Sequence, residues 1–135
     1  MKANASQIPW AVDDDCRTML PTMQSDITLS YGKKTLIIDA KCYSKNTQSQ
    51  YDKRTIHSGN LYQIFTYVKN KDAEYGEQPH NVSGMLLYAQ TDESVQPNNV
   101  YHMGGNKISV RTLNLNCSFN EIASQLDGIV AEHFA

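Results

Sequence analysis

The sequence predicts an α/β (α+β) fold in which helices flank a mixed central sheet. Three observations predict it. Apolar residues alternate with period two early in the chain, two later segments repeat them at helical intervals, and the segments run strand, strand, helix, strand, strand, helix. A length of 135 residues suits one hydrophobic core. We therefore expect residues 1–135 to form a single domain.

A hairpin is predicted between Met23 and Tyr43. Its first arm alternates, and its apolar face carries Met23, Ser25, Ile27 and Leu29. Gly32 supplies the turn, and the second arm, "TLIIDAKCY", is apolar on both faces at its centre, which is typical of a strand covered on both sides. Alternation in the second arm assigns Ile37, Asp39 and Lys41 to one face, and Ile38, Ala40 and Cys42 to the other, which we expect to pack the core.

The segments around this hairpin lack a regular period. Residues 1–20 predict irregular structure or a short extended segment, because prolines bracket a stretch without helical periodicity. Residues 44–56 are polar and predict a mobile loop.

Two helices and two further strands follow. Ser58 is a suitable N-cap for a helix whose apolar stripe is Leu61, Ile64, Phe65 and Val68. Residues 71–80 predict a polar connection, 82–90 a strand parallel to the hairpin, 98–106 a turn and 107–115 another strand. Ser118 and Glu121 have capping-box spacing before a final core-facing helix with apolar positions at Phe119, Ile122, Ala123, Leu126, Ile129 and Val130.

The composition is that of an ordinary globular chain, with 40% hydrophobic and 19% charged residues. No apolar run reaches the roughly 18 residues of a membrane span, and the first residues do not resemble a signal peptide, so we expect a cytoplasmic protein without a membrane partner. The three cysteines lack metal-binding spacing and predict reduced, mostly buried thiols. The net charge is −2, but residues 33–54 hold six basic and two acidic side chains, and such a patch can face phosphate.

Three charges stand in or beside the apolar hairpin. Asp39 and Lys41 are two apart on a strand and project from the same face, and Asp26 lies on the adjacent arm. Converging carboxylates repel unless a cation lies between them, and oxygen ligands favour a hard ion such as Mg²⁺. A lysine beside that ion can stabilise charge on a phosphate or orient a water. A simple ion pair between Asp39 and Lys41, with Asp26 capping a turn, is the structural alternative.

The helix after the loop adds two polar side chains. Gln63 and Tyr67 are four residues apart, so they share a helix face next to the apolar stripe and can reach the ends of the strands. In the alternative interpretation, Tyr67 packs at the edge of the helix and Gln63 faces solvent.

Together these segments resemble a known family. "LPTMQSDITL", "LIIDAKCY" and "IHSGNLYQIFTYV" are similar to the McrC family, the nuclease subunits of McrBC-type modification-dependent restriction systems, within the PD-(D/E)XK nuclease superfamily. The resemblance is strong over residues 20–68, and the later segments are compatible with it. It implies a restriction-endonuclease-like core and a metal-dependent endodeoxyribonuclease.

The resemblance also implies roles for individual residues. Asp26 and Asp39 would hold Mg²⁺, for which Mn²⁺ can substitute, with the backbone carbonyl of Ala40 as a third contact. Lys41 would be the catalytic lysine, with Gln63 and Tyr67 as supporting residues. The implied partners are double-stranded DNA and a McrB-like AAA+ GTPase that recognises methylated cytosine. Double-strand cutting with one site per chain also suggests a homodimer.

At its N-terminus we expect the sequence to depart from the family, without the family's N-terminal region and without a helix before the first strand. Asp13, Asp14 and Asp15 are candidate substitutes for an upstream acidic ligand. We expect Lys45, Lys53 and Arg54 to follow the DNA backbone. Two alternatives stay open: a catalytically inactive DNA-binding or interaction module that keeps the nuclease fold, and another Q-x-x-x-Y nuclease in DNA repair.

Overall fold

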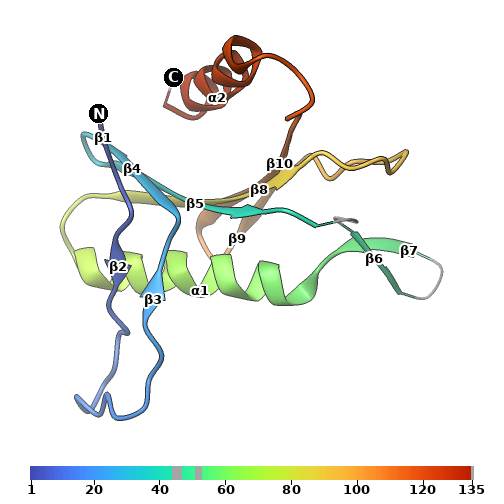
Figure 1. Ribbon diagram of the computed structural model, residues 1–135. Helices are drawn as coiled ribbons and strands as arrows, with labels where there is room; N and C mark the ends of the chain where they lie inside the picture. The colour runs from blue at the N-terminus through green and yellow to red at the C-terminus, as the bar shows by residue number, and fades with distance from the viewer. Residues whose placement is uncertain (44–46, 51–52, 135) are drawn as a thin grey trace.

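The central sheet lies between two helices in the computed structural model, which describes residues 1–43, 47–50 and 53–134 (Figure 1). Of residues 48–50, 53 and 54 it describes the backbone alone. Within these residues the sheet has six strands, in the order β1 (Lys2–Asn4), β4 (Ile27–Tyr31), β5 (Lys34–Lys41), β8 (Asn81–Ala89), β10 (Asn106–Leu113) and β9 (Asn99–Met103). Strands β5, β8 and β10 are parallel, and the other pairings are antiparallel. The predicted mixed α+β fold is therefore confirmed.

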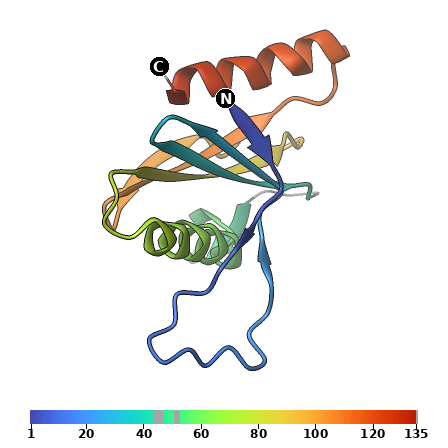
Figure 2. The same cartoon turned by 90° about the vertical axis from the view of Figure 1, so that its left-hand side faces the viewer.

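Each face of the sheet is covered by a helix. α1 (Ser58–Tyr75) lies below the sheet in Figure 1 and α2 (Phe119–Phe134) above it, and Figure 2 shows the same layers from the side. The sheet side of α1 buries the predicted stripe, with Ile64 and Val68 at the centre of the core. On β5, Ile37 packs in this core, whereas Leu36 and Ile38 pack on the α2 side, so the strand is covered on both sides as predicted.

The predicted hairpin is formed by β4 and β5. Gly32 turns the chain with φ 61°, and the register pairs Leu29 with Leu36 and Ile27 with Ile38. The first arm is not continuous, however. It is split into β3 (Met23–Gln24) and β4 by a break at Ser25 and Asp26.

The break explains why the predicted apolar face fails at Ile27, which is 38% exposed. The buried Ser25 donates its N–H to the carbonyl of Ser6 at 3.2 Å, and its hydroxyl lies 2.6 Å from that of Thr28. These contacts bury Ser25 and Thr28 and change the phase of the alternation between them. Asp26 therefore lies where the chain leaves one strand and enters the next.

Two segments without a regular period contain strands, and the short strands within residues 1–20 agree with the expected short extended segment. The backbone of β6 (Thr47–Gln50) pairs with that of β7 (Lys53–Ile56) in an antiparallel ribbon, so the described part of residues 44–56 is not a loop. β2 (Gln7–Ile8) pairs with β3, and this ribbon packs Ile8 and Met23 against the α1 core. Backbone pairing forms a ladder without an alternating apolar pattern, which is why periodicity missed the β6/β7 ribbon.

Several predicted boundaries are also wrong. α1 already contains Ser58, so His57 rather than Ser58 occupies the N-cap position, and the helix continues to Tyr75 instead of ending before residue 71. The predicted turn at 98–106 is largely strand β9, and only Gly104 and Gly105, both with positive φ, turn the chain. The strands predicted at 82–90 and 107–115 are confirmed as β8 and β10.

The final helix begins at the predicted capping box. The hydroxyl of Ser118 accepts the Glu121 N–H at 3.2 Å, and the Glu121 carboxylate accepts the Ser118 N–H at 3.2 Å. The C-terminal half of α2 packs on the sheet through Ile129, Val130 and Phe134. Phe119 is 81% exposed and Leu126 is 38% exposed, so the prediction that these two residues face the core is wrong.

The end of β5 is less buried than predicted. Ala40 and Cys42 are exposed, because the strand leaves the covered part of the sheet after Asp39. The thiols are free as predicted, but Cys16 is also exposed and Cys117 is half-buried, so the expectation of mostly buried cysteines is wrong. None of the described helices is long and apolar enough to span a membrane.

We predict that Gly84→Ala destabilises the chain, because an added Cβ would lie 2.7 Å from Ile64 and 2.8 Å from Val68. Crowding of this kind in a packed core costs about 1–3 kcal/mol. Gly128→Ala is the matched control, since a Cβ there meets nothing within 4 Å, and alanine in a helix interior is favoured by roughly 0.5–1 kcal/mol. Urea unfolding monitored by circular dichroism measures both effects, and equal stability of the two variants would contradict the packing of α1 on β8.

Candidate active site

The break before β4 places Asp26 beside the end of β5. Ile27 pairs with Ile38, so the next step back along β4 brings Asp26 opposite Asp39 and Ala40. The Ala40 N–H donates to Oδ2 of Asp26 at 2.8 Å. The Asp26 carboxylate thus accepts the hydrogen bond that a backbone carbonyl would accept if the strand pairing continued, and Asp26 itself stays exposed.

Asp39 is the buried carboxylate of the site, with 4% of its surface exposed. Its Oδ2 lies 2.7 Å from Nζ of Lys41, but this ion pair lacks hydrogen-bond geometry, and Oδ2 accepts no hydrogen bond from the described residues. Burial raises the pKa of Asp39, and the neighbouring Asp26 carboxylate raises it further, although Lys41 opposes the change. A second positive charge would be stabilised here.

Lys41 connects the strand to the helix. Its Nζ donates to Oε1 of Gln63 at 2.8 Å, and Nε2 of Gln63 donates to the Tyr67 hydroxyl at 3.0 Å. Burial lowers the pKa of Lys41, but the contact with Asp39 outweighs burial and leaves that pKa raised. Lys41 is therefore protonated at neutral pH. The Asp39–Lys41 ion pair of the structural alternative is present, but it forms part of a longer polar chain.

The structure brings together all the residues to which the resemblance assigned catalytic or metal-binding roles, namely Asp26, Asp39, Ala40, Lys41, Gln63 and Tyr67. Lys45 lies outside the described residues, as do the side chains of Lys53 and Arg54, whose backbone belongs to β7. Their contact with DNA stays a prediction.

The oxygen atoms at the end of β5 fit a hard divalent cation. The N–H and C=O of one strand residue point to the same side, so the Ala40 carbonyl is directed toward the Asp26 side, as its N–H is. Two carboxylates and one carbonyl are ligands that Mg²⁺ accepts, since this ion usually keeps several waters. The two carboxylates face a single lysine, so the Asp26, Asp39 and Lys41 side chains keep a net negative charge when ionised, which supports this fit.

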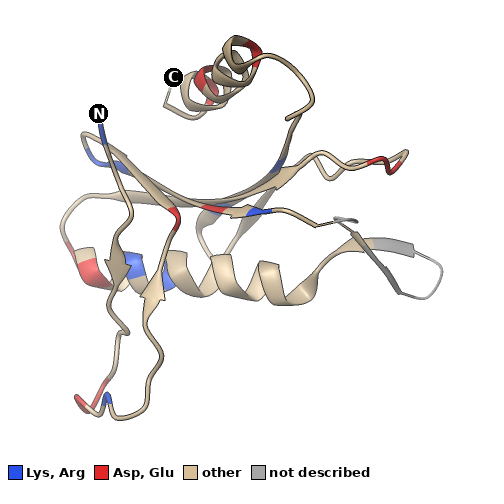
Figure 3. Cartoon of the chain, in the orientation of Figure 1, with Lys and Arg blue, Asp and Glu red and all other residues tan. Residues whose placement is uncertain are grey.

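No upstream acidic group joins these ligands within the described chain. Asp13, Asp14 and Asp15 lie in the long connection between β2 and β3, which projects beyond α1 (Figure 3). The described residues contain no cluster of three or more His, Cys, Asp or Glu side chains that could hold a metal. The prediction that one of these three aspartates substitutes for the missing ligand is therefore wrong in this arrangement.

Sequence reasoning missed a second polar chain beside the first. Nδ2 of Asn60 donates to the Tyr88 hydroxyl at 2.9 Å, and the Tyr43 hydroxyl donates to Oδ1 of Asn60 at 3.1 Å. Asn60 precedes Gln63 by three residues and so lies on the same face of α1, which was the available signal. The pairing of Tyr88 with Lys41 on the neighbouring strand could not be found, because local periodicity does not specify strand register.

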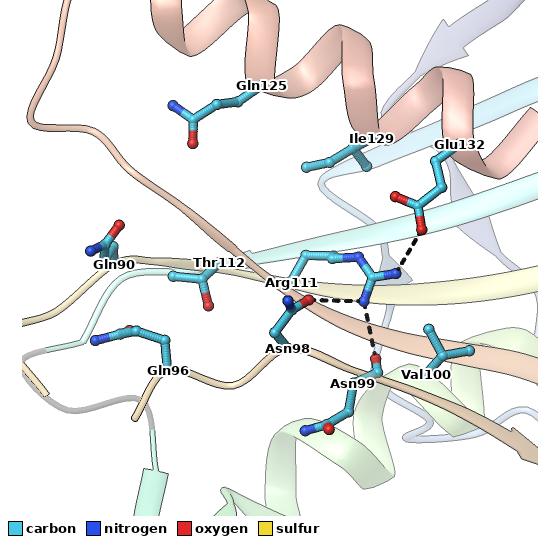
Figure 4. A pocket seen from close by; sticks show the side chains of 10 residues that line it. All are labelled: Gln90, Gln96, Asn98, Asn99, Val100, Arg111, Thr112, Gln125, Ile129 and Glu132. Atoms are coloured by element: carbon cyan, nitrogen blue, oxygen red, sulfur yellow. Dashed lines mark hydrogen bonds and ion pairs between the residues drawn. The ribbon is translucent and has the colours of Figure 1, made fainter. Parts of the chain in front are cut away.

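A cavity of about 600 Å³ lies away from these residues, between α2, β10 and the segment before β9 (Figure 4). Several of its polar side chains form hydrogen bonds with one another or with the backbone. The Arg111 guanidinium donates to Oδ1 of Asn98 at 3.1 Å and to Oε1 of Glu132 at 3.1 Å. Gln96 donates to backbone carbonyls of its own loop. These bonds hold the loop and α2 in place, and we assign the chemistry to the end of β5.

A mixed sheet between helices, with Asp39, Ala40 and Lys41 at the end of a central strand, is consistent with a restriction-endonuclease-like core. No family model matches the chain. The chain is 32% identical over 131 residues, 95% of its length, to the type IV methyl-directed restriction enzyme EcoKMcrBC of Escherichia coli (strain K12). This similarity confirms the resemblance to the McrC family. The matched part is 36% of the relative, so the chain spans about a third of that protein's length.

We predict that Asp39→Asn gains stability relative to the parent chain as pH rises in metal-free buffer. Because burial raises the pKa of Asp39 above its ordinary value of 3.8, ionisation destabilises the folded chain. The parent chain therefore has a stabilising contribution that is complete below pH 3.8 and lost as pH rises through the folded pKa, and the variant has no such contribution. Urea unfolding across this pH range measures the difference.

Asp127→Asn, on the exposed side of α2, controls for the loss of one charge. A difference between Asp39→Asn and the parent chain that stays constant with pH would contradict the burial of an ionisable Asp39.

Proposed function

We propose that the chain is a metal-dependent DNA endonuclease domain that hydrolyses phosphodiester bonds, as the catalytic part of a McrC-like subunit. The observation that carries the proposal is the meeting of Asp26, Asp39 and Lys41 at the end of the hairpin, with Gln63 bound to the lysine. The similarity to a methyl-directed restriction enzyme supports the same class of substrate.

In this proposal Asp26, Asp39 and the Ala40 carbonyl hold Mg²⁺ or Mn²⁺. When bound, the ion polarises a phosphoryl oxygen and makes water a better nucleophile. The protonated Lys41 stabilises the negative charge that grows on the scissile phosphate. Gln63 fixes the position of the Lys41 ammonium by accepting its hydrogen bond, and Tyr67 fixes the Gln63 amide in turn.

The proposal assigns recognition of the modified site to a partner. A McrB-like AAA+ GTPase would select methylated cytosine, and this chain would cut without reading the base itself. A homodimer would supply a second site for the opposite strand. Each of these assignments extends to the chain what the resemblance implies for whole McrBC systems.

A non-catalytic DNA-binding or interaction module is the second candidate, and two observations favour it. Lys41 already neutralises Asp39 at 2.7 Å, and the described residues contain no cluster of three acidic, histidine or cysteine ligands. A protein with its carboxylate neutralised in this way can keep its fold without binding a metal ion. Metal binding therefore separates the two candidates.

We predict that the chain nicks supercoiled plasmid DNA in the presence of Mg²⁺, GTP and its partner GTPase. Asp39→Ala and Lys41→Ala should each lower the nicking rate by about 100-fold or more, because the first removes a ligand of the metal ion and the second removes the positive charge that stabilises the transition state. Asp127→Asn should keep the parent rate. Agarose gels quantify nicked and linear products, and equal rates for the parent chain and Asp39→Ala would contradict a catalytic role.

A linear substrate run in parallel tests the other enzymatic alternative. Degradation of linear DNA without nicking of closed circles would favour an exonuclease of the Q-x-x-x-Y type in repair over an endonuclease.

We predict that Mn²⁺ or Mg²⁺ binds the isolated chain through Asp26 and Asp39. Isothermal titration calorimetry should detect a site that Asp26→Asn weakens and Asp39→Asn weakens further, because Asp39 is the more buried ligand. Asp127→Asn should bind as the parent chain does. Heat that is absent, or that neither substitution changes, would leave the non-catalytic module as the better account.

A further inference from the structure

Tyr43 combines an exposed ring with a tethered hydroxyl. It lies two residues beyond the end of β5, and 42% of its surface is exposed. Its hydroxyl nevertheless donates to Oδ1 of Asn60 at 3.1 Å, and Asn60 is only 7% exposed. An exposed tyrosine usually hydrogen-bonds water, so this tether to a buried side chain on α1 fixes the ring in one orientation.

The tether continues into the core. Nδ2 of Asn60 donates to the hydroxyl of Tyr88 at 2.9 Å, and Tyr88 is fully buried on β8. A buried amide and a buried phenol would each be costly if left unbonded, so Asn60 and Tyr88 hold one another in place. Burial also raises the pKa of Tyr88, which keeps its hydroxyl protonated.

The hydrogen-bonded residues Tyr43, Asn60 and Tyr88 lie directly beside Lys41. Tyr88 is the register partner of Lys41 on the neighbouring parallel strand, so both side chains project from the α1 face of the sheet. The Tyr43 ring centroid lies 6.3 Å from that of Tyr88 and 5.2 Å from that of His57. The Tyr43 ring is therefore held on two sides while much of its surface faces solvent next to the lysine.

We propose that Tyr43 is a nucleotide-contacting residue. Its exposed ring packs against the sugar, or against an unstacked base, of the DNA strand whose phosphate lies at Asp39 and Lys41. Asn60 and Tyr88 are positioning residues that hold the ring ready for this contact. Aromatic side chains bind successive nucleotides by stacking, and a ring that is already fixed loses less conformational entropy on binding. The inference rests on the proposed function, because it names a contact with the same substrate.

The test is DNA affinity measured without cleavage. Fluorescence anisotropy in Mg²⁺, with the partner GTPase and GTP left out, follows the binding of a fluorescein-labelled 25-mer, as a single strand and as a duplex, to the whole chain, and gels of the same samples check that the probes stay intact. Tyr43→Ala should weaken binding of the single strand by about tenfold, within the range measured for loss of one base stack, and the duplex less, because its bases stay stacked. Tyr62→Ala is the matched control, since Tyr62 is 68% exposed on α1, and it should bind as the parent chain does.

A double-mutant cycle tests whether Asn60 acts through Tyr43. Asn60→Ala and Tyr43→Phe each remove the tether but keep the aromatic ring, so each should weaken binding about two- to threefold. The variant with both substitutions should bind DNA no less tightly than the single variant with the lower affinity. Additive losses would show that Asn60 contributes only through general stability, and thermal unfolding of each variant reports that stability separately.

The outcomes distinguish this inference from the function on which it rests. If the parent chain and Tyr43→Ala bind both probes equally, the nucleotide contact is overturned and the proposed substrate stands. Losses that are equally large for Tyr62→Ala also overturn it. If the parent chain binds neither probe, the proposed DNA substrate fails, and the contact fails with it.

Discussion

The structure depends on one constraint, a carboxylate buried at the end of the central strand. Asp39 is 4% exposed in a strand whose preceding residues are core, and an unpaired charge there would cost several kcal/mol. The Lys41 ammonium forms an ion pair with the Asp39 carboxylate at 2.7 Å, and Gln63 on α1 accepts a hydrogen bond from the same ammonium. The packing of α1 on the sheet and the chemistry at the strand end are therefore linked, because the helix that covers the core also carries the amide.

The second carboxylate depends on a local irregularity. Asp26 is within reach of Ala40 because the first arm of the hairpin breaks at Ser25, where the chain changes partners. An unbroken strand would have continued the ladder and left the Ala40 N–H to a backbone carbonyl. The break interrupts the alternation of buried and exposed residues by one position. It also places the Asp26 side chain where a regular strand would have a backbone group. Burial raises the pKa of Asp39, the neighbouring Asp26 carboxylate raises it further, and the pair of carboxylates favours a cation.

The sequence predicted the parts of this site that follow from short periods. Alternation placed Asp39 and Lys41 on one face of their strand, and helical spacing placed Gln63 and Tyr67 on one face of their helix, because each rule acts within one element. The break at Asp26 was missed, since it depends on contacts with Ser6, far away in sequence. The β6/β7 ribbon was missed because its polar residues show no period. The hydrogen bonds that link Tyr43, Asn60 and Tyr88 connect the segment after β5 with α1 and β8. The strand register that aligns these residues appears only in the folded molecule.

The most direct test of the account is a crystal structure of the chain soaked in Mn²⁺, with the ion located by its anomalous signal. The account predicts one ion bound by carboxylate oxygens of Asp26 and Asp39 and by the Ala40 carbonyl, at distances of about 2.1–2.2 Å. It also predicts that Lys41 moves away from Asp39 while keeping its hydrogen bond to Gln63. An ion bound elsewhere, or a site that stays empty with the Asp39–Lys41 pair intact, would contradict the claim that these carboxylates form a metal centre.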